Sequence, residues 1–436
     1  MQTRSHCFVV VLVILAACSR TAVTTSPTSS VTTSSATSSS IPATTVLATS
    51  APARAVSSAN SDGAVAVIDG FGLQLARRGL GLDRGNSALS PLSVATALTM
   101  TSAGARGDTA AEMNRVLGIA DPATIHESMN TFDQSVAASQ VEPKADDERS
   151  IELATANRAF VQNDLAMEQP FLNTLASQYG SDVGPVNFRG NQEAARTTIN
   201  GWVNDRTKAH IPELIGKGII TEDTRLALVN ALYLKANWAI PFATAVPGRF
   251  NTPTGAVQVP MMGDTHRGQI AAGDGWRAVD LPYVGDRLSM TIVLPDEGKF
   301  DAVVGQLDAM HMAAMRSANE GPVADLKMPK FDIAKNIRLD NQLKALGMNV
   351  AFSGAADFSG MTTSERLQIQ TVIHQATVTV NENGTVATAA TAMLAFPVSA
   401  PPTTPFLVDR PFLFFISDHT TDAVLFVGQV IDPTTS

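Results

Sequence analysis

Serine, histidine and cysteine side chains are the first candidates for chemistry in this chain, and their spacing argues against a catalytic site. No serine lies in the G-x-S-x-G elbow of α/β-hydrolases, and no lysine follows a serine by three residues, as it does in β-lactamases. A phosphate-binding G-x-x-x-x-G-K-[ST] loop and the zinc spacings C-x-x-C and H-E-x-x-H are also missing. The sequence therefore predicts neither a hydrolase nor an obvious metalloenzyme, and we expect no metal site.

His374 is the most unusual histidine because it interrupts an apolar strand pattern, Val372-Ile373-His374. A lone histidine in such a strand is more often a hydrogen-bonded core group than a catalytic base, so a structural role is favoured. His210 lies at the end of an expected helix, where capping is the simpler role. Polar surroundings indicate surface positions for four others: His126, His266, His311 and His419.

The most unusual stretch is residues 381–405, where alanines and threonines run between two strongly apolar strands. One interpretation is an alanine-rich helix, but the many threonines and the start at Gly384-Thr385 disfavour it. The other interpretation is a long surface loop, and loops of this length in compact domains are usually functional or disordered. The composition therefore favours an exposed functional loop.

The elements that must hold this loop are helices in the first part of the chain and mostly strands in the second. Val67, Phe71 and Leu75 recur at helical spacing, and Ser90 before Pro91 is a favourable helix start. This order predicts an α+β domain and not a parallel βαβ repeat. The expected helices are 63–78, 91–100, 109–117 and 191–209, and the expected strands are 225–233, 288–294, 323–331, 369–380, 412–417 and 423–430.

Residues 1–17 have the pattern of an export signal. Arg4 precedes an unbroken apolar run over residues 8–17, which as a helix would rise about 15 Å, half of the hydrocarbon core of a bilayer. The run ends in Leu15-Ala16-Ala17-Cys18, which resembles the bacterial lipobox, in which the cysteine becomes the lipid-modified N-terminus. The resemblance predicts lipid attachment at Cys18. The alternative is a plain secretory signal with an incidental cysteine.

Residues 18–60 differ in composition from the rest of the chain. Of the 42 residues 19–60, 22 are Ser or Thr and none is acidic, which predicts that Cys18 is followed by a disordered tether. Residues 61–436 contain no further linker or repeat and predict one domain. The net charge of -9 argues against a nucleic-acid partner. The predicted location is the bacterial cell envelope, with the domain held by its lipid anchor on the outer face of the membrane.

Over residues 61–436 the chain resembles the serpins, a family of serine protease inhibitors. Residues 228–238, LVNALYLKANW, are close to the family's L-V-N-A-x-Y-F-K-G-x-W, and residues 86–93, NSALSPLS, are similar to its N-x-x-F-S-P-x-S. All the similar stretches follow one another in the family's order, which makes the resemblance specific. The others are 104–109, 157–160, 374–376 with 382–385, and 409–416 with 425–430.

The resemblance implies a serpin fold with mixed and antiparallel sheets, a large central sheet, about eight to nine helices and an exposed reactive loop at about 382–405. It also implies that a serine protease cleaves this loop and is trapped as a covalent acyl-enzyme. The cleaved loop then enters the central sheet as a new strand. Such a protein is not an enzyme and needs no cofactor, and we expect a monomer whose partner is the target protease.

Insertion requires uncharged loop residues of modest size, because successive strand residues face opposite sides of a sheet. The inward-facing set that starts at Thr385 includes Ala387 and Ala389, and none of its members is charged. Gly384, two residues after Glu382, supplies conformational freedom at the hinge. The twelve residues from Thr385 to Phe396 would extend over about 40 Å, enough for a long strand.

The bond that the protease cleaves is bracketed by family spacing. Counting sixteen residues from Glu382 gives the bond between Val398 and Ser399, whereas a count from the C-terminal signature gives Ala400. Proline follows Ala400 and blocks most serine proteases, so we prefer Val398. Valine suits an elastase-like pocket and not the cation-binding pocket of trypsin. The remaining alternatives are Ala400, Met393 and Leu394.

The other matching residues have structural roles in the family. Four residues align with the family's buried polar cluster beneath the central sheet: Ser90, Ser93, Asn230 and His374. Trp238 aligns with the point where the loop first enters the sheet. None of these residues is expected to be catalytic.

The resulting functional hypothesis is a suicide-substrate inhibitor of an elastase- or chymotrypsin-like serine protease. Asn383 and Val386 replace residues that are commonly acidic in the family hinge, which predicts slower insertion. A non-inhibitory serpin, acting as a surface binding module or as a protease substrate, is the alternative. An unrelated secreted enzyme is disfavoured by the missing catalytic motifs.

Overall fold

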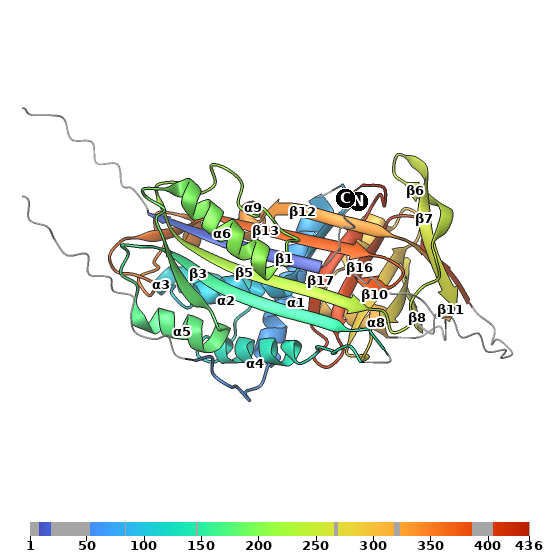
Figure 1. Ribbon diagram of the computed structural model, residues 1–436, viewed down its shortest axis with the longest axis horizontal. Coiled ribbons are helices and arrows are strands. Elements are labelled where there is room, and N and C mark those ends of the chain that lie inside the picture. Colours follow the sequence, from blue (N-terminus) through green and yellow to red (C-terminus); the bar gives the residue numbers. More distant parts are fainter. Residues whose placement is uncertain are drawn as a thin grey trace, which may run out of the picture.

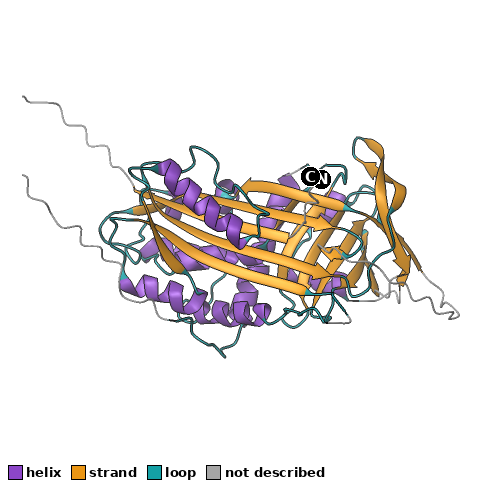
Figure 2. Ribbon diagram, viewed as in Figure 1, coloured by secondary structure: helices purple, strands orange, loops and turns teal. Residues whose placement is uncertain are grey.

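The computed structural model describes residues 8–18, 53–82, 84–144, 147–265, 269–317, 323–385 and 404–435. These residues form three β-sheets with helices packed around them (Figures 1 and 2). The long strands of the largest sheet run along the long axis of the molecule, and α6 covers part of the face that is turned toward the viewer. The mixed α+β architecture predicted from the sequence is confirmed.

The largest sheet, here called the central sheet, positions the functional loop. Its middle strand β5 is buried at every residue except Lys235, which explains why the segment is apolar on both faces. Its strands are antiparallel to their neighbours apart from the parallel pair β3 and β4. The order is β12 (Phe331–Arg338), β13 (Leu367–Val380), β1 (Phe8–Cys18), β5 (Thr224–Asn237), β3 (Ile151–Gln162) and β4 (Asp182–Val186), and the short β14 (Gly384–Thr385) also pairs with β5.

Two further sheets complete the β structure. The six-stranded sheet lies behind the central sheet in Figure 1 and holds the fully buried apolar strands near the C-terminus. Its order is β2 (Ser87–Leu89), β17 (Val424–Val430), β16 (Phe412–Asp418), β10 (Leu288–Pro295), β9 (Trp276–Pro282) and β8 (Gln269–Gly273). The four-stranded sheet has the order β15 (Thr404–Leu407), β11 (Val323–Pro329), β7 (Gly255–Thr265) and β6 (Val246–Thr252).

The helices begin and end where local chemistry favours it. Ser90 caps α2 by accepting a hydrogen bond from the Ser93 N–H, and Pro91 occupies the first helical position. Gly118 ends α3 in the left-handed conformation. The helices are α1 (Asp62–Leu82), α2 (Pro91–Ser102), α3 (Gly107–Leu117), α4 (Ile125–Ala137), α5 (Gln169–Tyr179), α6 (Gln192–Arg206), α7 (Phe300–Gly305), α8 (Ala309–Arg316) and α9 (Asp340–Ala345), with a short 3-10 turn at Val350–Phe352.

The tether was expected to extend to residue 60, and this boundary is wrong by several residues. The Ala55 N–H donates to the Ser177 carbonyl of α5 at 2.8 Å. Arg54 forms a 2.6 Å ion pair with Asp133 of α4 and also donates from Nε to Asn130. These contacts fix residues 53–60 to the domain despite their Ser- and Ala-rich composition. The part of the tether before residue 53 lies outside the described residues.

The apolar run expected to be an export signal is a strand in the structure. Residues Phe8–Cys18 form β1 in the middle of the central sheet, and Cys18 is its last residue, opposite Leu367. The expected processing of this segment stays a prediction. No helix in the described part of the chain is long and apolar enough to cross a membrane.

Candidate functional site

The predicted site residues that the structure describes gather along one gap in the central sheet. We define the insertion slot as the space between β5 and β13, which β1 fills (Figure 1). Trp238, Glu382, Gly384 and Thr385 lie at the end of the slot near Asn237. The polar cluster lies at the middle of the slot and beneath it. Ala387, Ala389, Val398 and Ser399 lie outside the described residues.

The hinge, defined as residues 381–385, turns back sharply after β13 and starts a new strand. Asn381 and Gly384 form an antiparallel bridge, and Gly384 and Thr385 then pair with Asn237 and Ala236 of β5. Gly384 has a φ of +132°. A Cβ atom there would lie 2.3 Å from the Ala236 carbonyl oxygen, so only glycine fits this close approach.

Trp238 ties the hinge to the end of β5. Its indole Nε1 donates to the Asn381 carbonyl at 3.0 Å, and its backbone N–H donates to the Asn383 carbonyl at 3.1 Å. The ring stacks on Tyr283 with 4.7 Å between centroids and is almost fully buried. Trp238 therefore joins the end of β5 to the hinge, and its role in loop entry stays a prediction.

Glu382 fixes the other side of the hinge. Its carbonyl accepts from the Phe242 N–H at 2.7 Å, and its carboxylate accepts from the Ala245 N–H and lies 3.0 Å from Lys330 Nζ. Burial acts to raise the pKa of this carboxyl, but the backbone hydrogen bonds and Lys330 outweigh it, so the pKa is lowered. Glu382 is thus held ionised by its partners.

A buried polar cluster lies at the middle of the slot. The Ser90 N–H donates to His374 Nε2 at 3.1 Å, and Ser90 Oγ donates to the Leu425 carbonyl at 2.7 Å. On the opposite strand, Asn230 Nδ2 donates to Asn157 Oδ1 at 2.7 Å. The structure therefore brings Ser90 and His374 together, and the Ser93 N–H donates to Ser90 Oγ at 3.1 Å beside them.

Three atoms of this cluster lack a hydrogen-bond partner among the described residues: His374 Nδ1, Asn230 Oδ1 and Ser93 Oγ. Because His374 Nε2 accepts a hydrogen bond, its Nδ1 carries the proton of the neutral ring. Burial lowers the pKa of His374 to about 3. His374 Nδ1 is therefore a donor and Asn230 Oδ1 an acceptor. They belong to residues that flank Leu12 on either side of β1.

β1 occupies the path that the hinge has begun. Phe8 pairs with Leu234 of β5, and β14 pairs with Ala236 and Asn237 just beyond it. Both strands are antiparallel to β5, so they run in the same direction. Extending β14 by two residues would place Ala387 opposite Leu234, where Phe8 lies.

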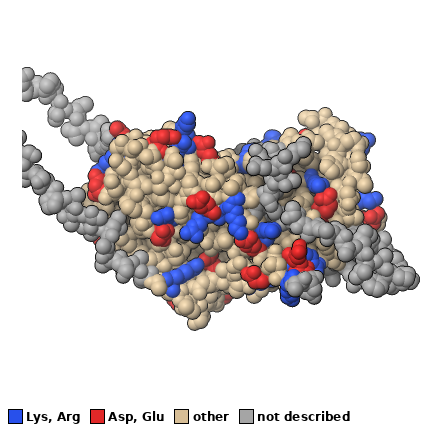
Figure 3. Space-filling model, viewed as in Figure 1, with Lys and Arg blue, Asp and Glu red and all other residues tan. Residues whose placement is uncertain are grey.

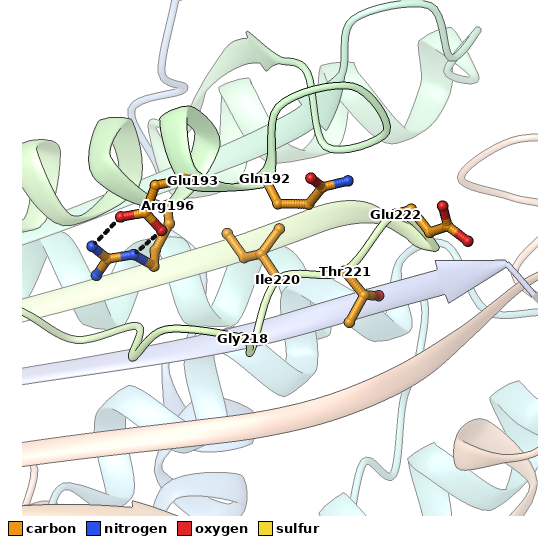
Figure 4. Close-up of a pocket in the computed structure, with 7 residues that line it drawn as sticks. All are labelled: Gln192, Glu193, Arg196, Gly218, Ile220, Thr221 and Glu222. Carbon is orange, nitrogen blue, oxygen red and sulfur yellow. Dashed lines mark hydrogen bonds and ion pairs between the residues drawn. The ribbon is translucent and has the colours of Figure 1, made fainter.

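A recess elsewhere on the surface shows no catalytic arrangement among its lining residues. It lies between α6 and residues 218–222 and is open to solvent (Figure 4). The guanidinium of Arg196 in this recess donates to Glu193, to Glu213 and to the Ile215 carbonyl. These contacts hold the chain after α6 in place. Among the described residues no cluster of His, Cys, Asp and Glu could hold a metal ion.

Charges on the face seen in Figure 3 are mixed, with Lys and Arg beside Asp and Glu, and they form no broad patch of one sign. This arrangement gives no electrostatic footprint for nucleic acid on that face.

Sequence patterns did not identify three residues that complete the site. Asn157 holds Asn230, Tyr283 supports Trp238, and Lys330 pairs with Glu382. Asn157 begins a stretch that resembles the serpin pattern and interrupts a strand, so its polarity was a usable signal. Lys330 is 52 residues from Glu382 in the sequence, and Tyr283 is 45 residues from Trp238, so no local pattern indicates either contact.

Comparisons with known proteins agree with this geometry. The profile of the serpin (serine protease inhibitor) family matches residues 66–433. An uncharacterised serpin-like protein of Thermococcus kodakarensis is 34% identical, over 80% of this chain and 81% of the relative. Leukocyte elastase inhibitor of Xenopus tropicalis is also 34% identical, over 80% of this chain and 93% of the relative.

Solved structures give the same result. The thermophilic serpin tengpin in its native state superposes with a TM-score of 0.76 at 25% identity, covering 87% of this chain and 97% of tengpin. Thyroxine-binding globulin in complex with thyroxine superposes with a TM-score of 0.72 at 27% identity, covering 85% of this chain and 100% of that protein. The chain therefore belongs to the serpin family, whose members include protease inhibitors.

Proposed function

We propose that this serpin is a suicide-substrate inhibitor of an elastase- or chymotrypsin-like serine protease. The observation that carries the proposal is the pairing of Gly384 and Thr385 with β5, on the path that an inserting loop would follow. Similarity to leukocyte elastase inhibitors supports the elastase-like choice of target.

In the proposed reaction, the serine hydroxyl of the protease attacks the carbonyl carbon of Val398. The bond to Ser399 breaks and its nitrogen leaves as an amine, so Val398 is joined to the protease as an ester. The loop from Thr385 onward then enters the central sheet and carries the protease to the far end before water reaches the ester. The small, uncharged residues at Ala387 and Ala389 favour this insertion.

The decisive experiment is incubation of the processed protein, which lacks residues 1–17, with a pancreatic-type elastase, followed by a denaturing gel and sequencing of the released fragment. We expect a gel-stable complex and a fragment that starts at Ser399. A matched variant, Val398→Arg, should lose the reaction with elastase and gain one with a trypsin-like protease, because trypsin's pocket requires a cation. Cleavage of both forms without any complex would refute the inhibitory function.

The second candidate is a non-inhibitory serpin that acts as a surface binding module or as a protease substrate. The structural similarity to thyroxine-binding globulin, whose solved structure contains thyroxine, is the observation in its favour. Complete loop cleavage without trapped protease would favour this candidate.

We further propose that the chain is exported and that Cys18 is lipidated, so that the domain stays on the outer face of a bacterial membrane. The Leu15-Ala16-Ala17-Cys18 sequence supports the proposal. Mass spectrometry of the envelope fraction should detect a diacylated Cys18, and Cys18→Ala should move the protein to the soluble fraction. Equal distribution of the two forms would refute lipid anchoring.

A further inference from the structure

The N-terminal strand and the reactive loop require the same place in the central sheet. β1 pairs with β13 from Val9 opposite Thr377 to Cys18 opposite Leu367, and with β5 from Phe8 opposite Leu234 onward. Both edges of the insertion slot are therefore hydrogen-bonded to β1 along most of its length. A second strand has no free edge there.

The residues of β1 align one for one with the loop residues that would continue β14 along β5. Because β14 and β1 run in the same direction along β5, Ala387 would take the position of Phe8, and each later loop residue would take the next position of β1. Phe396, the last residue before the proline that limits insertion, would take the position of Ala17 in this count. The N-terminal strand thus has nearly the length and the direction of the inserted loop.

Composition favours the N-terminal strand in this competition. Residues 8–14 are Phe-Val-Val-Val-Leu-Val-Ile, which are mostly β-branched and contain no charge, Gly or Pro. Such residues have high strand propensity, whereas the loop supplies mainly alanine and threonine over the corresponding positions. The chain between the strand and the domain, residues 19–52, has 34 residues, whose fully extended length is about 110 Å.

We propose that residues 8–18 act as an intramolecular plug of the insertion slot. While the plug is in place, a protease that cleaves the reactive loop is released, because the loop cannot enter the sheet. Hydrolysis of the Ala17–Cys18 bond, with one water molecule supplying the hydrogen and the hydroxyl to the new ends, removes the covalent link between the plug and the domain. The plug can then dissociate from the slot without rebinding as part of the same chain, and its departure arms the inhibitor. This inference rests on the proposed inhibitory function and describes its regulation in a precursor that folds before processing.

The test uses the full chain, produced without export so that residues 1–18 are retained, as verified by intact mass. Val11 and Val13 lie in the interior of β1, where each N–H faces one of the two neighbouring strands. A double variant, Val11→Pro with Val13→Pro, removes two ladder donors and should expel the strand. The matched control, Val11→Ile with Val13→Ile, keeps the donors and the strand propensity.

Two measurements report on the plug without depending on inhibition. Hydrogen exchange should show protected amides at residues 9–17 in the wild type and in the isoleucine control, but not in the proline variant. Cleavage of the reactive loop should raise the melting temperature of the proline variant by about 10 °C or more, as its loop enters the sheet, and leave that of the wild type unchanged.

Trapping of elastase is the third measurement. We expect at least about tenfold more gel-stable complex from the proline variant than from the wild type. Unprotected amides at 9–17 in the wild type, or equal thermal shifts in all forms, would overturn the plug. If exchange and thermal shifts behave as expected but no form traps protease, the plug stands and the inhibitory function fails.

Discussion

The two parts of the insertion slot differ in how well their polar groups are satisfied. At the hinge, the carbonyls of Asn381, Glu382 and Asn383 all accept hydrogen bonds from Trp238 or Phe242. At the middle of the slot, His374 Nδ1 and Asn230 Oδ1 are buried without partners among the described residues. The hinge is tied firmly to β5, whereas among the described side chains no hydrogen bond crosses the slot at its centre.

This difference shows how one sheet can hold a loop in register and still admit a strand. A buried polar group without a partner costs about 1–3 kcal/mol, so the expanded sheet carries a cost at its centre that closure would relieve. In a sheet closed without β1, the donor on His374 and the acceptor on Asn230 would face each other. The centre can therefore exist in two arrangements, and the hinge sets where an entering strand begins.

The largest expected effect comes from a charge placed at the start of the inserted strand. Thr385→Arg should abolish complex formation with elastase, by about 100-fold or more, because the guanidinium would have to be buried without a partner. Cleavage of the loop should continue at the wild-type rate, and this turns the inhibitor into a substrate. The measurement is the ratio of complex to cleaved protein on a denaturing gel.

Thr385→Ser is the matched control, because it keeps a small hydroxyl at the same position, and it should trap protease normally. Trapping by the arginine variant at the wild-type ratio would show that Thr385 does not enter the sheet.

The next largest effect concerns the close approach of the hinge to β5. Gly384→Val places a branched side chain where even a Cβ would lie 2.3 Å from the Ala236 carbonyl oxygen, at a φ of +132°. Strain of this kind costs about 1–3 kcal/mol and should slow complex formation about tenfold or more. The measurement is the second-order rate constant of protease inhibition.

Gly79→Ala in α1 is the control, because no described atom outside its chain neighbours and the nearby helix backbone lies within 4 Å of the added methyl group. It should leave the rate unchanged and stabilise the helix slightly. Equal rates for the valine and alanine variants would mean that the pairing of Gly384 with β5 plays no part in inhibition.

A pH titration probes the centre of the slot. The pKa of His374 is about 3 in the folded protein, against 6.5 for an unperturbed histidine, so folding favours the neutral ring. The resulting stability is complete above pH 6.5 and is lost as the pH falls toward 3, with a slope of up to about 1.4 kcal/mol per pH unit. Urea unfolding of the wild type and of His374→Gln between pH 7 and 4 should show a shallower slope for the variant.

His126 provides an independent comparison for this titration. Burial lowers its pKa to about 4, and its Nδ1 lies 2.7 Å from the Tyr179 hydroxyl, away from the slot. His126→Gln should therefore remove the contribution of His126 to the pH dependence of the free energy of unfolding. It should leave protease trapping unchanged. Identical slopes for the wild type and His374→Gln would contradict a buried neutral His374.

Sequence patterns predicted the strands because strands depend on local features, whereas the members of the polar cluster were named by the resemblance to the serpin family. The unbroken apolar runs of β5 and β16 indicate buried strands, and Trp238 and His374 stand within stretches similar to the serpin family. β1 could not be predicted, because a ten-residue apolar run fits an export signal, a helix or a buried strand equally well by periodicity. Its pairing depends on β5 and β13, which lie more than 200 residues away.

Residues 53–60 and Lys330 show a second limit of sequence patterns. Ser- and Ala-rich composition indicated disorder up to residue 60, yet the ion pair of Arg54 with Asp133 and the backbone bond of Ala55 hold this segment on α4 and α5. Lys330 contacts Glu382 only because the fold brings the start of β12 beside the hinge. Both contacts arise from tertiary structure and leave no periodic signal.

The smallest expected effect comes from removing the ion pair between Lys330 and Glu382 at the hydrogen-bonded hinge. Lys330 and Glu382 are partly exposed, so their interaction contributes about 0.5–1 kcal/mol at most. Lys330→Met should slow inhibition two- to threefold, and the difference from the wild type should shrink as salt screens the pair.

Lys327→Met serves as the control. It removes a nearby charge whose only ion pair in the described residues is with Asp325, at 3.7 Å. Because Glu382 keeps hydrogen bonds to backbone N–H groups, a loss of more than about tenfold on Lys330→Met would mean that the ion pair, and not the backbone, positions the hinge.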